Sequence, residues 1–480
     1  MKNKTKQREP AKISYFFGEG YRDLGRTIQV AWRKNGRKIA ESAENLRDSW
    51  GDTNVYCAIC LTVFNLAILI SIAIFGSLFT AAFTIVHIVL LAIFMSLVYL
   101  GFVLLRFVDT MFCLLNGLRT NCYNPACERK FTLPIYICPR CKELHYKLVP
   151  SKYGIFKRTC ECGHKLPTTF INGRQKLDSL CPHCKQPALK GMHKSLLIPV
   201  VGGANAGKTC FISMAIDQIS KKAPALKLSY QYQNVQGDEF SNNMNRMNRG
   251  LCPQKTNDLA FKYYNFYLTP KGHQIQNLIS VCDIAGEVFL NQDLMAKQQG
   301  YRFADALVVV IDPLSITEFR AELQKAMSEK DYAKLSGSTQ SMSDVLSGLV
   351  NTMESLYHSK ATDTIKTSVV IVFTKCDIPG LDEKIGRKAL TEYMNANKDA
   401  NICTASNALS ERFLLDYGES NFLNTVKSKF KEVQFFACSA LGHNNEGKQF
   451  APYNVELPLF WIIDKMNNTV DLSSIFKRKN

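Results

Sequence analysis

Residues 195–216 read SLLIPVVGGANAGKTCFISMAI: an apolar run, a glycine-rich turn, and an apolar pattern with helical spacing. Gly202 to Thr209 fit the pattern G-x-x-x-x-G-K-[ST], which is a P-loop when it follows a strand and opens a helix. Glycine lets backbone N–H groups close around a phosphate, and the dipole at the start of the helix adds to the attraction. The segment therefore predicts a strand–loop–helix unit that binds a nucleotide.

Most positions of this loop have an expected role. Lys208 should reach the β- and γ-phosphates, and the hydroxyl of Thr209 should bind Mg²⁺. The other positions expected to contact the nucleotide are Gly202, Asn205, Ala206, Gly207 and Cys210.

A second motif lies in "FKYYNFYLTPKGHQIQNLISVCDIAGE", residues 261–287, which reads as two strands. Asp283 ends the second strand, where its carboxylate can hold Mg²⁺ through water. The N–H of Gly286 can sense the γ-phosphate. Thr256 lies in the polar loop before these strands.

Two further segments select the base. "SVVIVFTKCD", residues 368–377, is a buried strand followed by Thr374, Lys375 and Asp377. The Asp377 carboxylate can accept hydrogen bonds from N1–H and the 2-amino group of guanine, a pair that adenine does not offer, and the Lys375 stem can cover the base. "VQFFACSALG", residues 433–442, ends in a turn whose backbone can contact the guanine O6. The residues of that turn are Ser439, Ala440 and Leu441.

In this order the motifs resemble the translation-factor/Ras-like class of P-loop GTPases, over about residues 194–465. The resemblance implies a mostly parallel sheet flanked by helices, with GTP or GDP and Mg²⁺ at the carboxyl ends of the strands. It also implies a switch threonine for Mg²⁺ before the strand that pairs with the strand of Asp283. Thr256 has this position, and the alternative is a loop threonine without a role. We assign residues 194–475 to this α/β GTPase domain. Residues 315–365 and 385–430 read as helical elaborations of a minimal domain of this class.

Two loop positions differ from the Ras pattern. Glu287 occupies the slot where many members carry a catalytic Gln, and Ala204 replaces a glycine, so that its methyl could hinder an incoming arginine finger. Asn205 gives G-x-x-N-x-G-K-T, which resembles the potassium-activated GTPases of tRNA modification and ribosome assembly. The hypothesis is that K⁺ or a partner supplies the catalytic charge through Asn205 and Glu287 orients water; the alternative is that Asn205 only forms a turn. Either way, slow turnover without help is expected.

Residues 119–190 are dense in cysteine. A large chain that places many of its 17 cysteines in close pairs favours zinc in a reducing compartment over disulfides. Eight thiols make two closed tetrahedral sites, with His164 and His183 as less favoured ligands. Neighbouring pairs can share a site in chain order, or the two inner pairs can form one site and the two outer pairs the other. The four pairs are Cys122/Cys127, Cys138/Cys141, Cys160/Cys162 and Cys181/Cys184.

No charged side chain occurs from Thr53 to Leu105. A spanning helix needs about 20 apolar residues, so the run predicts a transmembrane hairpin over 53–108. Its helices are expected near Val55–Phe75 and Ala82–Leu105, with a turn at Gly76-Ser77. Basic residues flank both outer ends, which by the positive-inside rule places both termini and the GTPase domain in the cytoplasm.

The formal charge of +18 is read as basic loops beside a membrane rather than nucleic-acid binding, and residues 1–52 as a basic cytosolic arm. The whole plan resembles the membrane-linked GTPase of bacterial double-GTPase systems. The resemblance implies a regulatory GTPase at the bacterial inner membrane, with a protein effector or a GTPase-activating partner. A GTP-binding scaffold without hydrolysis and a P-loop ATPase are the alternatives. The oligomeric state is left open.

Overall fold

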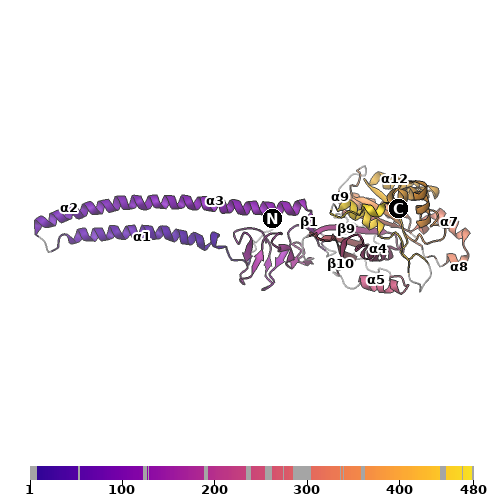
Figure 1. Cartoon of the computed structure of the whole chain (residues 1–480), viewed down its shortest axis with the longest axis horizontal. Helices are drawn as coiled ribbons and strands as arrows, with labels where there is room; N and C mark the ends of the chain where they lie inside the picture. Colours follow the sequence, from indigo (N-terminus) through magenta and orange to yellow (C-terminus); the bar gives the residue numbers. More distant parts are fainter. Residues whose placement is uncertain are drawn as a thin grey trace. The chain divides into compact units, whose positions relative to one another are not determined.

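The computed structural model divides into two compact units, which are described separately. One comprises Met1–Asn116, Leu133–Pro182 and Leu189–Gly191, and the other comprises Gly117–Thr132, His183–Ala188 and Met192–Asn480. Figure 1 traces their helices and strands along the chain. The described residues are 8–51, 54–122, 127, 129–188, 193–233, 239–253, 262–273, 275–284, 304–333, 335, 337, 338, 340–357, 363–443, 450–467 and 469–477.

The apolar segment of the first unit forms one continuous helix. α2 (Val55–Ser71), the π-helical turn η2 (Ile72–Gly76) and α3 (Ser77–Leu115) follow one another without a break. The predicted turn at Gly76-Ser77, and with it the hairpin, is wrong because both residues have right-handed helical backbone angles. A glycine costs a helix only about 1 kcal/mol relative to alanine, and this run contains no proline.

The helix Val55–Leu115 is long and apolar enough to cross a membrane, and it is the one such helix among the described residues. Helix α1 (Glu19–Asp48), preceded by the short η1 (Tyr15–Phe17), packs beside it. Trp32 Nε1 donates to Thr84 Oγ1 at 3.1 Å, and Asn35 Nδ2 donates to Ser77 Oγ at 3.1 Å. Polar side chains of the apolar helix thus face a partner helix that carries many charges.

The described residues before α1, from Arg8 onward, join the cysteine segment of the same unit. Ala11 forms an antiparallel bridge with Cys160. The Glu9 carboxylate accepts a hydrogen bond from the buried Arg158 at 2.8 Å. This pairing adds an ordered edge to a segment with little apolar core of its own.

The cysteine segment is built from very short strands. β3 pairs with β4 and with β7, antiparallel in each case, and β5 pairs with β6. The strands and 3₁₀ turn are β3 (Ile135–Ile137), β4 (Leu144–His145), β5 (Lys157–Thr159), β6 (Lys165–Pro167), η3 (Arg174–Lys176), β7 (Ser179–Leu180) and β8 (Pro187–Ala188).

The second unit is a mixed sheet with strand order β10-β11-β12-β9-β13-β14-β15. β12, β9, β13, β14 and β15 run parallel, while β10 and β11 are antiparallel additions at one edge. Two short strands join the sheet at the start of β9: β1 (Leu118–Asn121) pairs antiparallel with β9, and β2 (Lys130–Phe131) pairs antiparallel with β1. The main strands are β9 (His193–Gly202), β10 (Leu228–Gln233), β11 (Lys262–Pro270), β12 (Asn277–Asp283), β13 (Ala306–Ile311), β14 (Ser368–Phe373) and β15 (Val433–Ala437).

Helices cover both faces of the sheet. Alternate strand residues such as Val372 pack with α4 and α13 in one large apolar cluster. The next residue, Phe373, points to the other face because strand side chains alternate, and its ring contacts Phe413 of α11. The helices are α4 (Lys208–Lys222), α5 (Glu239–Asn248), η6 (Pro313–Ser315), α7 (Thr317–Ala326), α8 (Glu329–Tyr332), α9 (Met342–Tyr357), α10 (Arg387–Ala396), α11 (Ile402–Asp416), α12 (Ser420–Lys429), α13 (Leu457–Met466) and α14 (Ser473–Phe476).

Because β9, β12, β13, β14 and β15 are parallel, their carboxyl ends meet at one edge of the sheet. That edge collects Gly202, Asp283, Thr374 and Ser439, which the sequence placed at the ends of strands. The predicted α/β architecture is confirmed for this unit.

Candidate functional site

The loop between β9 and α4 has the backbone that a phosphate cradle requires. Gly207 precedes the helix with φ +84° and Asn205 has φ +60°, both in the left-handed region. Glycine adopts that region freely, and asparagine does so more readily than most residues. Lys208 Nζ donates to the carbonyl oxygens of Gly202 at 3.0 Å and Gly203 at 2.9 Å. The ammonium group therefore lies over the loop.

Thr209 and Asp283 come together beside this loop. The Thr209 hydroxyl donates to Asp283 Oδ2 at 2.7 Å. Burial raises the pKa of the Asp283 carboxyl above its usual value, while the Lys208 ammonium and the Thr209 hydroxyl oppose that rise. Among the described residues, the buried Asp283 Oδ1 accepts no hydrogen bond. A hydroxyl and a buried carboxylate oxygen at this place suit a Mg²⁺ ion with its water ligands.

The base-side residues connect directly to the phosphate loop. Thr374 Oγ1 donates to the carbonyl of Ala206 at 2.8 Å. Lys375, with φ +56°, donates from Nζ to the carbonyl of Asn205 at 2.9 Å. The two motifs, far apart in the chain, thus form one continuous polar edge.

Asp377 lies next to the turn after β15. Its Oδ1 accepts a short hydrogen bond from the Ser439 hydroxyl. Ser439 Oγ also accepts from the N–H of Gly442 at 2.8 Å, which closes the turn that contains Ala440 and Leu441. The carboxylate and this turn are the two elements expected to recognise guanine, and they are adjacent.

Sequence reasoning missed Asp312, which follows β13 at the same edge. Its side chain is fully buried and accepts from the N–H of Leu314 at 3.0 Å, the N–H of Ser338 at 2.7 Å and Nζ of Lys375 at 2.7 Å. The signal was present, because "ALVVVID" is a buried strand that ends in a carboxylate, like the strand of Asp283.

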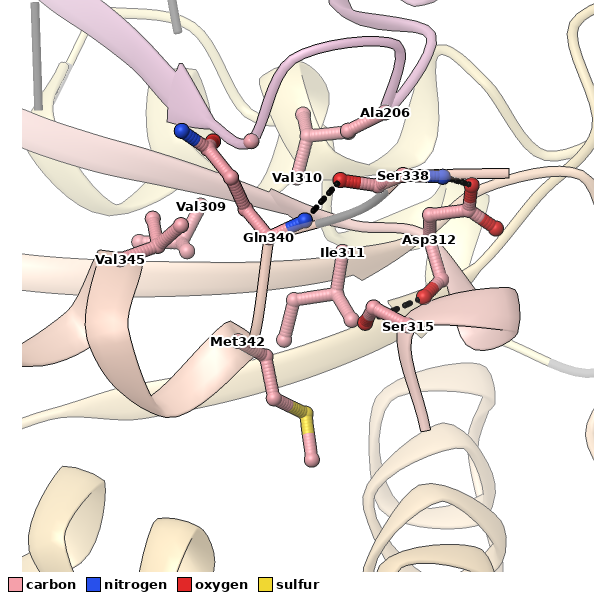
Figure 2. Close-up of a pocket in the computed structure, with 11 residues that line it drawn as sticks. Ala206, Val309, Val310, Ile311, Asp312, Ser315, Ser338, Gln340, Met342 and Val345 are labelled. Atoms are coloured by element: carbon pink, nitrogen blue, oxygen red, sulfur yellow. Dashed lines mark hydrogen bonds between the residues drawn. The ribbon is translucent and has the colours of Figure 1, made fainter. Parts of the chain in front are cut away.

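Sequence reasoning also missed Gln340, which precedes α9. Its Oε1 accepts from the N–H of Ala204 at 2.9 Å, and its own N–H donates to Ser338 Oγ at 3.3 Å. Figure 2 shows Gln340, Ser338 and Asp312 around the pocket that lies against the loop and β13. No pattern in the sequence marks Gln340, which lies 136 residues from Ala204.

Three predicted positions, Thr256, Gly286 and Glu287, lie outside the described residues. Their expected roles as Mg²⁺ ligand, phosphate sensor and water-orienting group remain predictions. Cys210, the last predicted contact of the loop, is half-buried at the start of α4.

The eight paired cysteines gather into two groups of four. In each group the sulfur atoms all lie within 4.8 Å of one another, and both groups consist of cysteine alone. Zn–S bonds of about 2.3 Å in a tetrahedron place sulfur atoms roughly 3.8 Å apart. The Cys138–Cys162, Cys141–Cys160 and Cys122–Cys184 sulfur distances are 3.7, 3.5 and 3.3 Å.

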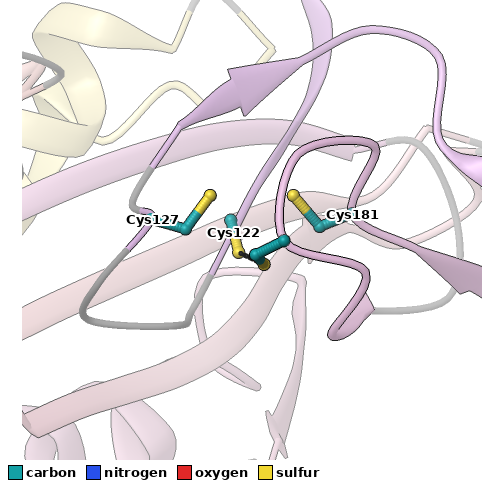
Figure 3. A group of neighbouring side chains, drawn as sticks. Cys122, Cys127 and Cys181 are labelled. Carbon is teal, nitrogen blue, oxygen red and sulfur yellow. Dashed lines mark hydrogen bonds between the residues drawn. The ribbon is translucent and has the colours of Figure 1, made fainter.

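Of the two pairings that the sequence left open, the inner-with-inner arrangement is confirmed. Cys138 and Cys141 join Cys160 and Cys162, and the outer cysteines form the second group (Figure 3). A hydrogen bond from the backbone of His164 helps lower the pKa of Cys162 to about 7, which favours a thiolate there. Both donor sets fit a structural zinc ion.

The sheet and the ordered motifs at its edge define a P-loop GTPase domain. Residues 196–419 match the family model Double-GTPase 2, and this match supports a P-loop GTPase of the double-GTPase type, as the sequence predicted.

Solved structures similar to the chain include Roco2 RocCORdC of Methanosarcina barkeri bound to GDP, at 10% identity and a TM-score of 0.23. They also include the Ski7 GTPase-like domain of S. cerevisiae bound to GTP, at 12% identity and a TM-score of 0.28. Each match covers 58% of this chain and 51% of the other, so the chain spans about half the length of the structures that it matches. No curated protein matches the chain.

Proposed function

We propose that the protein is a membrane-attached regulatory switch that binds GTP with Mg²⁺ and hydrolyses it to GDP. The observation that carries the proposal is the hydrogen bond between the Thr209 hydroxyl and the buried Asp283 carboxylate. This pair adjoins the Lys208 ammonium, and the Lys375 ammonium links the same loop to the guanine side. Phosphoryl transfer is catalysed mainly by positioning and charge stabilisation, which is what such an edge offers.

In the proposed complex each side chain has one task. Lys208 leaves the loop carbonyls for the β- and γ-phosphate oxygens, and Thr209 and Asp283 hold Mg²⁺. Asp377 accepts from the guanine N1–H and 2-amino group, and the turn with Ser439, Ala440 and Leu441 faces O6. The Mg²⁺ ion neutralises charge that develops on the phosphates.

The test of this function is GTP turnover by the purified full chain, with Lys208→Ala as the inactive partner. Removal of the Lys208 charge should lower kcat by roughly 100-fold or more, the scale of losing one strong transition-state donor. Equal turnover in the two chains would show that the activity does not come from this site.

The catalytic charge is proposed to come from K⁺ at Asn205 or from a partner protein, with Glu287 orienting water. The exposed, left-handed Asn205 supports this, as does the place of Ala204 where an arginine finger would approach. Turnover should rise when Na⁺ is replaced by K⁺. Equal rates in both salts would leave the partner protein as the source of charge.

The two cysteine groups are proposed to hold one Zn²⁺ each. Four thiols close a zinc coordination sphere and leave no open position, so the ions have a structural task. Metal analysis of the full chain should find two zinc ions per chain. One ion or none would mean that a cysteine group serves another purpose.

The continuous helix Val55–Leu115 is proposed to attach the protein to the bacterial inner membrane, with the GTPase domain facing the cytoplasm. At 1.5 Å per residue, 61 residues extend about 90 Å, roughly three times the thickness of the hydrocarbon core. Only part of the helix can therefore lie across a bilayer. Carbonate-resistant sedimentation with membranes, lost when the helix is deleted, would support attachment; a carbonate-soluble full chain would oppose it.

A GTP-binding scaffold is the second candidate, because the cysteine segment offers a metal-stapled surface for a protein partner. A scaffold would bind GTP tightly and release it unchanged. Turnover measured with and without candidate effectors separates the two functions.

A further inference from the structure

The pair Ser338 and Gln340 reaches the phosphate loop from the connection between β13 and α9. Gln340 Oε1 accepts the N–H of Ala204 at 2.9 Å, at the third position of the loop. A side chain on Gly203 would displace the pair, since a Cβ added there would lie 2.7 Å from Ser338 Oγ and 3.0 Å from Gln340 Oε1. The pair and the loop are therefore complementary in shape as well as in hydrogen bonding.

The same pair is anchored on the other side by Asp312. The N–H of Ser338 donates to Asp312 Oδ2 at 2.7 Å, and Lys375 Nζ donates to that same oxygen at 2.7 Å. Figure 2 shows the bonds from Gln340 to Ser338 and from Ser338 to Asp312. Because the Asp312 side chain has no solvent exposure, the two bonds to its carboxylate are shielded from competition with water.

Lys375 completes a closed circuit, since its Nζ also donates to the carbonyl of Asn205 at 2.9 Å. We call this circuit the hydrogen-bond ring. Its members are Ala204, Asn205, Lys375, Asp312, Ser338 and Gln340.

The ring holds the Ala204–Asn205 part of the loop at two points. Gln340 fixes the N–H at one end of it, and Lys375 fixes the carbonyl at the other. Lys375 belongs to the base-side motif, so its grip is expected in any guanine-binding state. Gln340, by contrast, lies outside all four sequence motifs. It acts on Ala204, the position that an approaching arginine finger would meet and the neighbour of Asn205.

We propose that Gln340 is a positioning residue for GTP hydrolysis, which sets the third and fourth loop positions from within the chain through its contact with Ala204. The inference rests on the proposed GTPase function and deepens it. Loss of the Gln340 acceptor removes the partner of the Ala204 N–H and leaves the Ala204–Asn205 part of the loop held by Lys375 alone. The affected step is stabilisation of the terminal phosphate in the transition state, whereas GDP is held by the remaining loop N–H groups and by Asp377.

The test substitutes Gln340→Met in the full chain, which keeps the side-chain length and removes the acceptor. Ser341→Ala is the matched control, because Ser341 accepts only a local bond from the N–H of Ser343 among the bonds resolved for its hydroxyl. Three quantities are measured: kcat and KM for GTP, the affinity for GDP, and the trapping of GDP with aluminium fluoride as a transition-state analogue.

The expected result for Gln340→Met is a roughly tenfold fall in kcat and in aluminium fluoride trapping, the scale of one hydrogen bond. KM and GDP affinity should stay within about twofold of the unaltered chain, and Ser341→Ala should change nothing. Gln340→Glu retains an acceptor and should recover most of the trapping. Unchanged kcat and trapping in Gln340→Met would overturn the inference, and so would a parallel loss of GDP affinity or a failure of Gln340→Glu to rescue.

A failure of the proposed function gives a different pattern. An unaltered chain without turnover in any salt would defeat GTP hydrolysis but not the role of Gln340 in shaping the loop. In that event the affinity for the imido analogue of GTP, relative to GDP, decides the inference. Gln340→Met should lower that ratio about tenfold, and an unchanged ratio would overturn the inference.

Discussion

The GTPase domain and the cysteine segment are each stabilised in a different way. The GTPase domain buries one large cluster of apolar side chains from its parallel strands and from α4 and α13. The buried cluster of the cysteine segment has only five residues, two of which are the metal-site candidates Cys138 and Cys160. A large apolar core stabilises a domain without a ligand, whereas a small segment of short strands depends on its metal. The two parts should therefore unfold under different conditions, the cysteine segment on loss of metal and the GTPase domain on loss of apolar packing.

The largest expected effect is therefore metal removal. Binding of a structural zinc supplies roughly 10 kcal/mol or more of folding free energy. A chelator should unfold Leu133–Pro182 and leave the thermal transition of the GTPase domain in place. Cys138→Ser removes a ligand from the inner cysteine group alone. Zinc content in Cys138→Ser should fall from two ions to one.

Cys403→Ser, in the GTPase domain and outside both cysteine groups, is the control for the loss of any thiol. Hydrogen exchange of the full chain reports each part separately. Loss of protection across the sheet of the GTPase domain after chelation would show that this domain also depends on zinc.

The next effect is expected in the apolar core. Phe460 of α13 has no solvent exposure, and Phe460→Ala should destabilise the GTPase domain by about 4 kcal/mol through lost burial and a cavity. Leu415→Ala is the control, because Leu415 is 56% exposed in the same domain. Denaturant unfolding measures both variants. A change below about 1 kcal/mol for Phe460→Ala would show that this core is looser than its burial indicates.

The sequence allowed most of the nucleotide edge to be predicted for a physical reason. Parallel strands bring their carboxyl ends together, so Asp283, Thr374 and Ser439 could be placed beside the loop without coordinates. Asp312 follows the same rule and could have been found. Gln340 could not, since its contact with Ala204 depends on the path of a long connection rather than on any local pattern.

The predicted hairpin was wrong for a different reason from the omission of Gln340. There, a local sequence pattern was given too much weight. Gly76-Ser77 reads as a turn between two apolar runs, but the helical conformation costs these residues little when no proline or charge interrupts the run. The pairing of cysteines was likewise beyond the sequence, since either order satisfies tetrahedral zinc. The β3–β4 hairpin and the β5–β6 hairpin each carry one inner knuckle, and both hairpins contribute to one buried cluster that contains Cys138 and Cys160.

A smaller effect is expected at the base site, where ligand affinity changes and the fold does not. Asp377→Asn should weaken GTP binding about 100-fold, because an amide cannot accept from both guanine donors. It should allow xanthine nucleotide to bind, because the amide N–H can donate to the carbonyl that xanthine has in place of the 2-amino group. Asp382→Asn is the control, since Asp382 lies in the same loop and accepts from the N–H of Lys388 at the start of α10. Fluorescent-nucleotide titration measures both chains. An unaltered preference for GTP in Asp377→Asn would count against guanine recognition by this carboxylate.

The smallest effect is a pH dependence at the far end of β9 from the nucleotide loop. His193 is almost fully buried, its Nε2 lies 3.2 Å from the Tyr267 hydroxyl, and burial lowers its pKa to about 4. An unfolded histidine titrates near 6.5, so the unfolded state binds the extra proton between about pH 6.5 and 4. The contribution of His193 to stability is therefore complete above about pH 6.5 and decreases as the pH falls, by at most about 3 kcal/mol.

His193→Gln should flatten this slope, whereas His273→Gln, at an exposed position, should leave it unchanged. Unfolding free energies of the GTPase domain at pH 7, 6 and 5 measure the slope. A slope that is equally steep without His193 would place the titrating group elsewhere and show that this end of the apolar core admits water.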